Sequence, residues 1–325
     1  MSFITKTPIT LDEARKIIQF HYGAHSQVGA FTELTDGMFN SAYLVEFADG
    51  LKQVLKVAPR NEVRVLRYER NIMQTEVEVL RLVKARTEMP VPSVSFYDTS
   101  RRLINNDYYL MDFVPGIAYH KLRAQFSPAE QYAIDHQTGV YLRQVNAIQG
   151  TGFGLFAFPE QLVLTWREGF DRLLKDIFLD GQEFPVELHL PYDEIYARLS
   201  RRLDSLDEVQ TPSLVHWDLW DGNIFIDPQT KAITGYIDFE RALWADPLME
   251  VNFGAFGENP AFLAGYGVEM LDTPAKKCRR TLYNIYLFLI MVIECYYRHF
   301  ATKDQENWAR LMLQQQLERL EEQSE

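Results

Sequence analysis

The sequence predicts an α+β protein with two lobes: a small N-terminal lobe of antiparallel strands with one main helix, and a larger, mostly helical C-terminal lobe. Three observations support this prediction. Short apolar runs separated by turn residues dominate the first 113 residues, alongside a leading helix and one main helical pattern. A Val-Pro-Gly turn at residues 114–116 then interrupts the chain, and helical patterns predominate after Ser127. We therefore expect an N-terminal lobe over residues 1–114 and a C-terminal lobe over residues 115–325.

The N-terminal lobe is expected to begin with a helix over residues 10–22, because Thr10 and Glu13 form a capping-box pattern ahead of an amphipathic run. Two strands around a glycine turn are predicted between residues 27 and 47, and a third strand over 53–57. Helical periodicity predicts the main helix over 70–86, which ends at a Met-Pro-Val-Pro segment. Further strands are predicted at 94–97 and 107–113.

The C-terminal lobe is expected to open with a helix at Ser127, where a capping box is combined with Pro128 at the first helical position. A short apolar run over 232–237 predicts a strand. The uncharged apolar run over 281–293 is shorter than the ~20 residues that a bilayer crossing needs, so we expect a buried helix there.

The charge balance bears on partners. The chain has 33 Lys and Arg against 45 Asp and Glu, a formal charge of -12, which disfavours nucleic acid and anionic membranes and favours a cationic small-molecule substrate. The alternative is an acidic surface that only aids solubility. Two cysteines are too few for a disulfide framework, and no secretory signal pattern is seen, so a cytoplasmic location is expected.

Two segments of the C-terminal lobe carry the side chains that phosphoryl transfer requires. Residues 216–223 read His-Trp-Asp-Leu-Trp-Asp-Gly-Asn, and residues 235–240 read Gly-Tyr-Ile-Asp-Phe-Glu. In protein kinases, a loop aspartate takes the acceptor proton, and an asparagine and a second aspartate hold magnesium. By this layout Asp218 is the predicted base, and Asn223 and Asp238 are the predicted ligands of Mg²⁺, which prefers oxygen donors. We expect His216 to support the loop by hydrogen bonds.

Lys56 is the next strongest signal. A lysine between Leu55 and Val57 in a strand must reach solvent or meet an anion, and a nucleotide phosphate would serve. Glu76, on the following helix, is the expected partner that holds the ammonium in place. Each residue alone has a simpler interpretation, as an edge lysine and a solvated glutamate. The motifs downstream favour the functional interpretation of both.

Other nucleotide contacts are predicted from position. Gly37, with Asn40 and Ser41, lies one strand before Lys56, where backbone amides that face the phosphates are needed. A single glycine in a turn is most often only a turn. Backbone groups of Asp112 and Val114 are expected to contact the adenine edge.

Three residues beside the reaction loop are candidates for substrate binding. Asp221 and Glu240 have carboxylates that would suit a substrate amine, although internally paired or solvated carboxylates are more common. Trp220, like Trp217, either lines the acceptor pocket or packs the loop.

Residues 216–225, 237–240 and 245–247 resemble the aminoglycoside phosphotransferase and choline kinase-like superfamily, and the segments 76–82, 111–116 and 152–154 are also similar to its pattern. The resemblance implies a protein-kinase-like fold, ATP or GTP as donor with Mg²⁺, and transfer to a hydroxyl of a small molecule. By position it implies the same roles for Asp218, Asn223 and Asp238, and phosphate contact by Lys56 with Glu76 behind it. Many members have glycine where this chain has Trp217.

The family resemblance and the net charge together favour an aminoglycoside-like antibiotic, or another amine-bearing compound, as the acceptor. A metabolic kinase of the choline, homoserine, methylthioribose or fructosamine type is the alternative, since the same core serves all of these. A nucleotide-binding pseudokinase that acts as a sensor is a hypothesis from another class. It conflicts with the complete catalytic set, because a binding module does not need Asp218.

Overall fold

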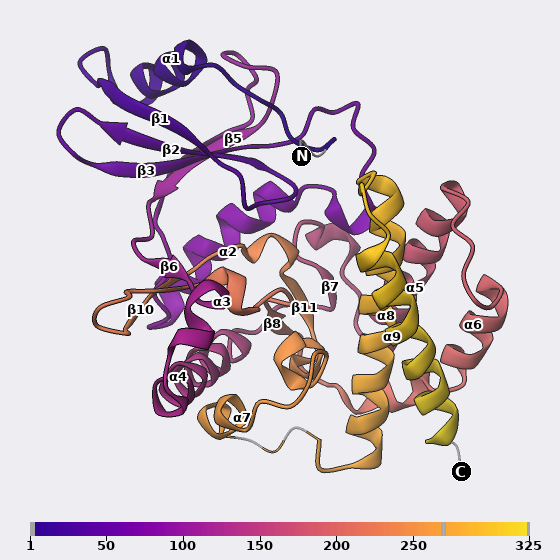
Figure 1. The fold of residues 1–325 in the computed structure, drawn as a ribbon. Coiled ribbons are helices and arrows are strands. Elements are labelled where there is room, and N and C mark those ends of the chain that lie inside the picture. Colours follow the sequence, from indigo (N-terminus) through magenta and orange to yellow (C-terminus); the bar gives the residue numbers. More distant parts are fainter. Residues whose placement is uncertain (1–3, 268, 270, 324–325) are drawn as a thin grey trace.

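The two predicted lobes are present in the computed structural model, which describes residues 4–323 apart from 268 and 270 (Figure 1). The N-terminal lobe contains a five-stranded antiparallel sheet with the strand order β1-β2-β3-β5-β4. Its strands are β1 (Val28–Leu34), β2 (Ser41–Phe47), β3 (Lys52–Val57), β4 (Val94–Asp98) and β5 (Tyr108–Asp112). The predicted α+β fold class is confirmed.

Helices cover both faces of this sheet. The leading helix α1 (Leu11–Tyr22) packs with Leu55 and Tyr108 in one apolar cluster, and the main helix α2 (Ile72–Arg86) packs with Val54 and Tyr109 in another. Successive strand side chains point to opposite faces, so Lys56 lies on the same face as Val54, toward α2. Figure 1 shows α2 between the sheet and the C-terminal lobe, where its buried side chains belong to the large core of that lobe.

The C-terminal lobe is mainly helical, as predicted. The structure gives α3 (Tyr119–Leu122), α4 (Pro128–Asn146), α5 (Trp166–Glu183), α6 (Tyr192–Ser200), α7 (Pro260–Tyr266), α8 (Pro274–Tyr297) and α9 (Asp304–Glu322). The capping box at Ser127 is formed, with Pro128 in the first turn of α4. Residues 281–293 are the centre of α8, and nearly all of their side chains are buried, which confirms the buried helix. None of the helices in the described part of the chain has the length and apolar character that a membrane crossing requires.

Two small three-stranded sheets carry the motif loops. One has the order β10-β9-β6 and the other β7-β11-β8. Their strands are β6 (Ile117–Ala118), β7 (Gly154–Leu155), β8 (Ser213–Val215), β9 (Ile224–Ile226), β10 (Ile233–Tyr236) and β11 (Leu243–Ala245). Of these, the sequence predicted only β10, because the others are too short to show a period. The first motif loop runs from the end of β8 to the start of β9, and the second follows β10.

Candidate functional site

The lysine of β3 joins the two lobes electrostatically. Lys56 Nζ donates to Glu76 Oε1 at 2.6 Å and to Asp238 Oδ1 at 3.1 Å, and its side chain is only 9% exposed. Burial lowers the pKa of Lys56, but the carboxylates of Asp238 and Glu76 outweigh this effect and hold the pKa well above its ordinary value. The lysine is therefore charged, and it faces the segment that the sequence predicted to hold a metal.

Asn223 and Asp238 lie side by side because the two motif loops are hydrogen-bonded to each other. Ile237 N donates to the carbonyl oxygen of Asn223 at 3.1 Å, and Asp238 adopts the left-handed conformation with φ 70°. Asn223 Nδ2 donates to the Asp218 carbonyl at 2.8 Å, and its amide oxygen accepts no hydrogen bond from the residues that the structure describes. Although burial opposes ionisation, Lys56 lowers the pKa of Asp238. An ionised carboxylate beside an amide oxygen fits the oxygen preference of Mg²⁺.

Asp218 lies in the same loop and is partly accessible. Its side chain is 27% exposed, and the Nε atom of Arg241 lies 3.8 Å from its Oδ2. Burial raises the pKa of Asp218 to about 7, against the opposing effect of Arg241. A carboxylate with a pKa close to neutrality suits a group that accepts a proton during reaction and releases it afterwards.

His216 joins the two motif loops. Its Nε2 lies 3.2 Å from the carbonyl oxygen of Ile237, and its Nδ1 accepts a hydrogen bond from Asp218 N at 3.2 Å. Burial lowers the pKa of His216 to about 4, so the ring is neutral near pH 7. A neutral ring that donates from Nε2 and accepts at Nδ1 satisfies both contacts. The histidine thus fixes the backbone next to Asp218.

Glu250 supports the same loop, and sequence reasoning did not identify this role. Its Oε1 accepts from His216 N at 2.8 Å and from Asn146 Nδ2 at 3.1 Å, and its Oε2 accepts from Trp217 N at 2.9 Å. The side chain is fully buried, and burial raises its pKa to about 7. Glu250 lies 34 residues after His216, so no local pattern in the sequence links the two.

Trp217 stands where many members of the resembling family have glycine, and its conformation shows why glycine suits this position. Its backbone has φ 64°, a left-handed conformation that glycine adopts without steric cost. The indole is only 2% exposed and stacks on Tyr286, with ring centroids 5.3 Å apart. Trp217 therefore packs the loop against α8 and does not line an acceptor pocket.

The loop between β1 and β2 contacts the second motif loop through Asn40. Asn40 Nδ2 donates to Glu240 Oε2 at 2.8 Å. Ser41 Oγ accepts from Thr7 N at 2.8 Å, so its oxygen is already used. Gly37 is exposed, and the space where its Cβ would stand is 3.6 Å from Lys6 Nζ. Of the three predicted residues, Gly37 is thus the most accessible.

Lys6 is a further cation that sequence reasoning missed. The N-terminal segment runs beside this loop, and Lys6 Nζ donates to the Asn40 carbonyl at 2.7 Å. Burial lowers the pKa of Lys6, while Glu33, Asp238 and Glu240 act in the opposite direction. The ammonium therefore lies within electrostatic reach of the same acidic groups that surround Lys56.

The predicted adenine contacts lie where the chain leaves β5. Asp112 N donates to the Ser93 carbonyl at 2.9 Å, so this N–H is already used. The Val114 N–H has no acceptor among residues 4–267, 269 and 271–323. An unpaired backbone N–H at the junction of the lobes suits a base-edge contact.

The residues predicted to bind a substrate amine are engaged within the protein. Asp221 Oδ2 pairs with Arg123 Nη1 at 2.9 Å. Glu240 is buried, and its carboxylate oxygens lie within 4.8 Å of those of Glu76 and Asp238. Glu240 therefore belongs to the acidic group around Lys56 and is not free for an amine. Trp220 is 46% exposed and lies beside His120, with ring centroids 5.2 Å apart.

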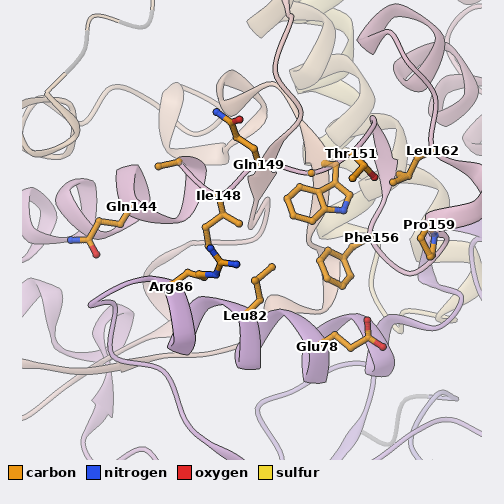
Figure 2. Close-up of a pocket in the computed structure, with 13 residues that line it drawn as sticks. Glu78, Leu82, Arg86, Gln144, Ile148, Gln149, Thr151, Phe156, Pro159 and Leu162 are labelled. Carbon is orange, nitrogen blue, oxygen red and sulfur yellow. The ribbon is translucent and has the colours of Figure 1, made fainter.

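A separate cavity lies behind α2. It has a volume of about 710 Å³ and contains none of the predicted site residues. Figure 2 shows its lining, including Leu82 and Arg86 of α2, Phe156 and Thr151. Leu82 and Arg86 are four residues apart and share one face of α2, which is turned roughly 100° around the helix from Glu76.

Comparison with known proteins agrees with this geometry. The model of the phosphotransferase enzyme family (APH) matches residues 30–276. Over 219 residues the chain is 23% identical to a probable acyl-CoA dehydrogenase, IBR3, of Arabidopsis thaliana, covering 67% of this chain and 26% of that protein. The chain thus spans about a quarter of that relative's length.

Solved structures share the fold. A protein from Haemophilus somnus assigned as a fructosamine-3-kinase aligns with a TM-score of 0.68 and 16% identity, over 94% of this chain and 96% of that one. A thermostable mutant of aminoglycoside phosphotransferase APH(4)-Ia, in a ternary complex with AMP-PNP and hygromycin B, aligns with a TM-score of 0.64 and 19% identity, over 94% and 98%. At these identities the likeness shows the protein-kinase-like fold.

Proposed function

The chain belongs to the phosphotransferase enzyme family, and from this premise we propose that it transfers the γ-phosphate of ATP or GTP to a hydroxyl of a small molecule with the help of Mg²⁺. The observation that carries the proposal is the meeting of four groups from both lobes. Lys56 contacts Asp238, Asp238 lies beside Asn223, and Asn223 is bonded to Asp218. Positioning and charge neutralisation are what phosphoryl transfer needs from a protein.

The proposed reaction assigns one task to each group. The acceptor hydroxyl oxygen forms a bond to the γ-phosphorus, the bond from that phosphorus to the β,γ-bridging oxygen breaks, and the nucleoside diphosphate leaves. The hydroxyl proton goes to Asp218. Lys56 contacts the phosphates and is held in place by Glu76. Mg²⁺, held by Asn223 and Asp238, would neutralise phosphate charge.

The net charge and the similar solved structures suggest two classes of acceptor. An amine-bearing antibiotic is favoured by the formal charge of -12. The aminoglycoside phosphotransferase that binds hygromycin B has the same fold. A metabolic hydroxyl compound is the second class, and the similar structure assigned as a fructosamine-3-kinase represents it. Asp221 and Glu240 are engaged within the protein, which weakens the argument for an amine.

The experiment is the substitution Asp218→Asn. We expect turnover to fall by about 10² or more, because the variant loses the proton acceptor, while nucleotide affinity stays close to that of the wild type. Product formation over a panel of aminoglycosides and metabolites is followed by mass spectrometry and by ADP release. The matched control is Asp193→Asn, an exposed position on α6 far from the motif loops.

The sensor hypothesis makes a different prediction in the same assays. A nucleotide sensor would be stabilised by ATP or GTP with magnesium, and would yield no phosphorylated product from any hydroxylated acceptor. Equal turnover in the wild type and the Asp218→Asn variant would remove the role proposed for Asp218.

A further inference from the structure

Arg241 lies beside the proposed base, and its guanidinium donates no hydrogen bond to the residues that the structure describes. It ends η6 (Phe239–Arg241), and its side chain is 14% exposed. Its Nε lies 3.8 Å from Asp218 Oδ2 and its Nη2 lies 3.5 Å from Glu294 Oε2. Neither contact is a hydrogen bond, and no other residue in 4–267, 269 or 271–323 accepts one from this guanidinium. Its N–H groups are therefore available to a ligand.

The neighbouring arginine shows the contrast. Arg298 Nη2 donates to Glu69 Oε1, and its Nη1 lies 3.4 Å from the Met38 carbonyl, so Arg298 has a buried carboxylate of its own. Glu294 lies between the two arginines, at 3.6 Å from Arg298 Nε, and its Oε2 accepts no hydrogen bond within the described part of the chain. The carboxylates of Asp218 and Glu294 thus balance the positive charge of Arg241 without accepting hydrogen bonds from its guanidinium N–H groups.

The position of Arg241 is nevertheless fixed. Its guanidinium carbon lies 5.6 Å from the centre of the Tyr68 ring, so the ring packs beside it. Glu294 is on α8 and Asp218 is on the first motif loop, so three elements hold the side chain. A guanidinium that is held in place with unbonded donors is prepared to bind a ligand.

The chemistry of the side chain identifies the ligand class. A guanidinium presents its donors in a planar fork that matches the two oxygens of a carboxylate, phosphate or sulfate. Because Arg241 lies so close to Asp218, a group bound by Arg241 and a hydroxyl placed on Asp218 are only a few bonds apart. We infer that the acceptor is a hydroxy compound with an oxyanion near its reacting hydroxyl, such as a short hydroxy acid, and that Arg241 selects it.

This inference rests on the proposed phosphotransferase function and narrows its acceptor. It favours a metabolic hydroxy acid over an aminoglycoside, in keeping with the internal pairing of Asp221 and Glu240. A second source of the same oxyanion chemistry is the phosphoryl group in transfer, which also passes close to Asp218. The experiment therefore separates an oxyanion of the acceptor from that of the donor.

The test uses the full chain and matched acceptors, namely short hydroxy acids and their primary amides. We expect the wild type to phosphorylate acids with a kcat/KM at least tenfold above that of the amides. Arg241→Gln is expected to abolish this preference, and Arg241→Lys to keep part of it. The control is Arg102→Gln, an exposed position outside the site that forms no ion pair with any described residue. Thermal unfolding of each variant separates a loss of folding from a loss of selectivity.

Hydrolysis of ATP by water provides the second arm, because water carries no oxyanion of its own. An unchanged water reaction in Arg241→Gln, with the acid preference lost, supports the inference. An equal loss in both reactions assigns Arg241 to the phosphoryl group and overturns it. Equal phosphorylation of acids and amides by the wild type also overturns it, while the phosphotransferase function stands. Absence of both phosphorylation and hydrolysis would instead reject the proposed function.

Discussion

The substitution Glu250→Gln tests whether a buried carboxylate holds the catalytic loop. The carboxylate accepts from His216 N at 2.8 Å, Trp217 N at 2.9 Å and Asn146 Nδ2 at 3.1 Å. Glutamine keeps one acceptor oxygen and replaces the other with an NH₂ group that faces a backbone N–H. One charge-assisted hydrogen bond is then lost, at about 2 kcal/mol, and a buried donor is left unpaired, at a similar cost. Burial also raises the pKa of Glu250 to about 7, so its ionised form costs the folded state about 3 kcal/mol, which the neutral glutamine recovers. The two effects nearly cancel, and we expect the free energy of unfolding at pH 8 to fall by no more than about 1 kcal/mol.

The same substitution is expected to reduce turnover. A displacement of the loop by about 1 Å costs roughly 10²-fold in rate, because Asp218 loses its position against the acceptor. Nucleotide affinity should change little, since Lys56 and Glu76 make no contact with Glu250. Denaturant unfolding and turnover are measured at pH 8, above the pKa of about 7 to which burial raises Glu250. Glu258→Gln, at an exposed position, is the control. Turnover equal to that of the control would refute the reasoning, and so would a loss of stability above about 3 kcal/mol.

Two further predictions concern His216 and Lys6. The folded pKa of His216 is about 4 against an ordinary value of 6.5, so the unfolded chain binds the proton first, and stability is lost as pH falls from 6.5 to 4. Unfolding curves across this range should show a wild-type loss of about 3 kcal/mol relative to His216→Asn, whereas parallel pH profiles would contradict the prediction. Lys6→Gln removes a cation near the proposed phosphate site, and we expect the KM for nucleotide to rise roughly fivefold, which corresponds to about 1 kcal/mol. The exposed Lys16→Gln is its control, and an equal KM in both variants would exclude phosphate contact by Lys6.

Much of the fold was predictable because local chemistry agreed with the tertiary structure. The capping boxes at Thr10 and Ser127 mark real helix starts, and the expected contact between Lys56 of β3 and Glu76 of α2 is formed. The strands β6, β7, β8, β9 and β11 were not predicted, because runs of two or three residues show no period. Their pairing depends on partners that are distant in the sequence.

The candidate site was predictable where its residues belong to one short motif. Asp218 and Asn223 are five positions apart, and the structure brings Asp238 beside them through a backbone hydrogen bond. Glu250 and Arg241 were missed for a different reason. Their importance lies in contacts with buried partners on other elements, and a glutamate or arginine in the sequence gives no sign of burial.

The Gly-containing loop between β1 and β2 is fastened to α8. Arg298 reaches the Met38 carbonyl of this loop and is paired with Glu69, and the side chains of both charged residues are almost fully buried. Breaking such a pair costs about 3 to 5 kcal/mol, so we expect this contact to be open in fewer than roughly one molecule in a hundred. Binding and release of the nucleotide are therefore expected to depend on rotation of the N-terminal lobe about the 113–116 connection, while its contact with the end of α8 stays closed. Faster nucleotide release after Arg298→Lys would support this role of Arg298, and an unaltered release rate would argue against it.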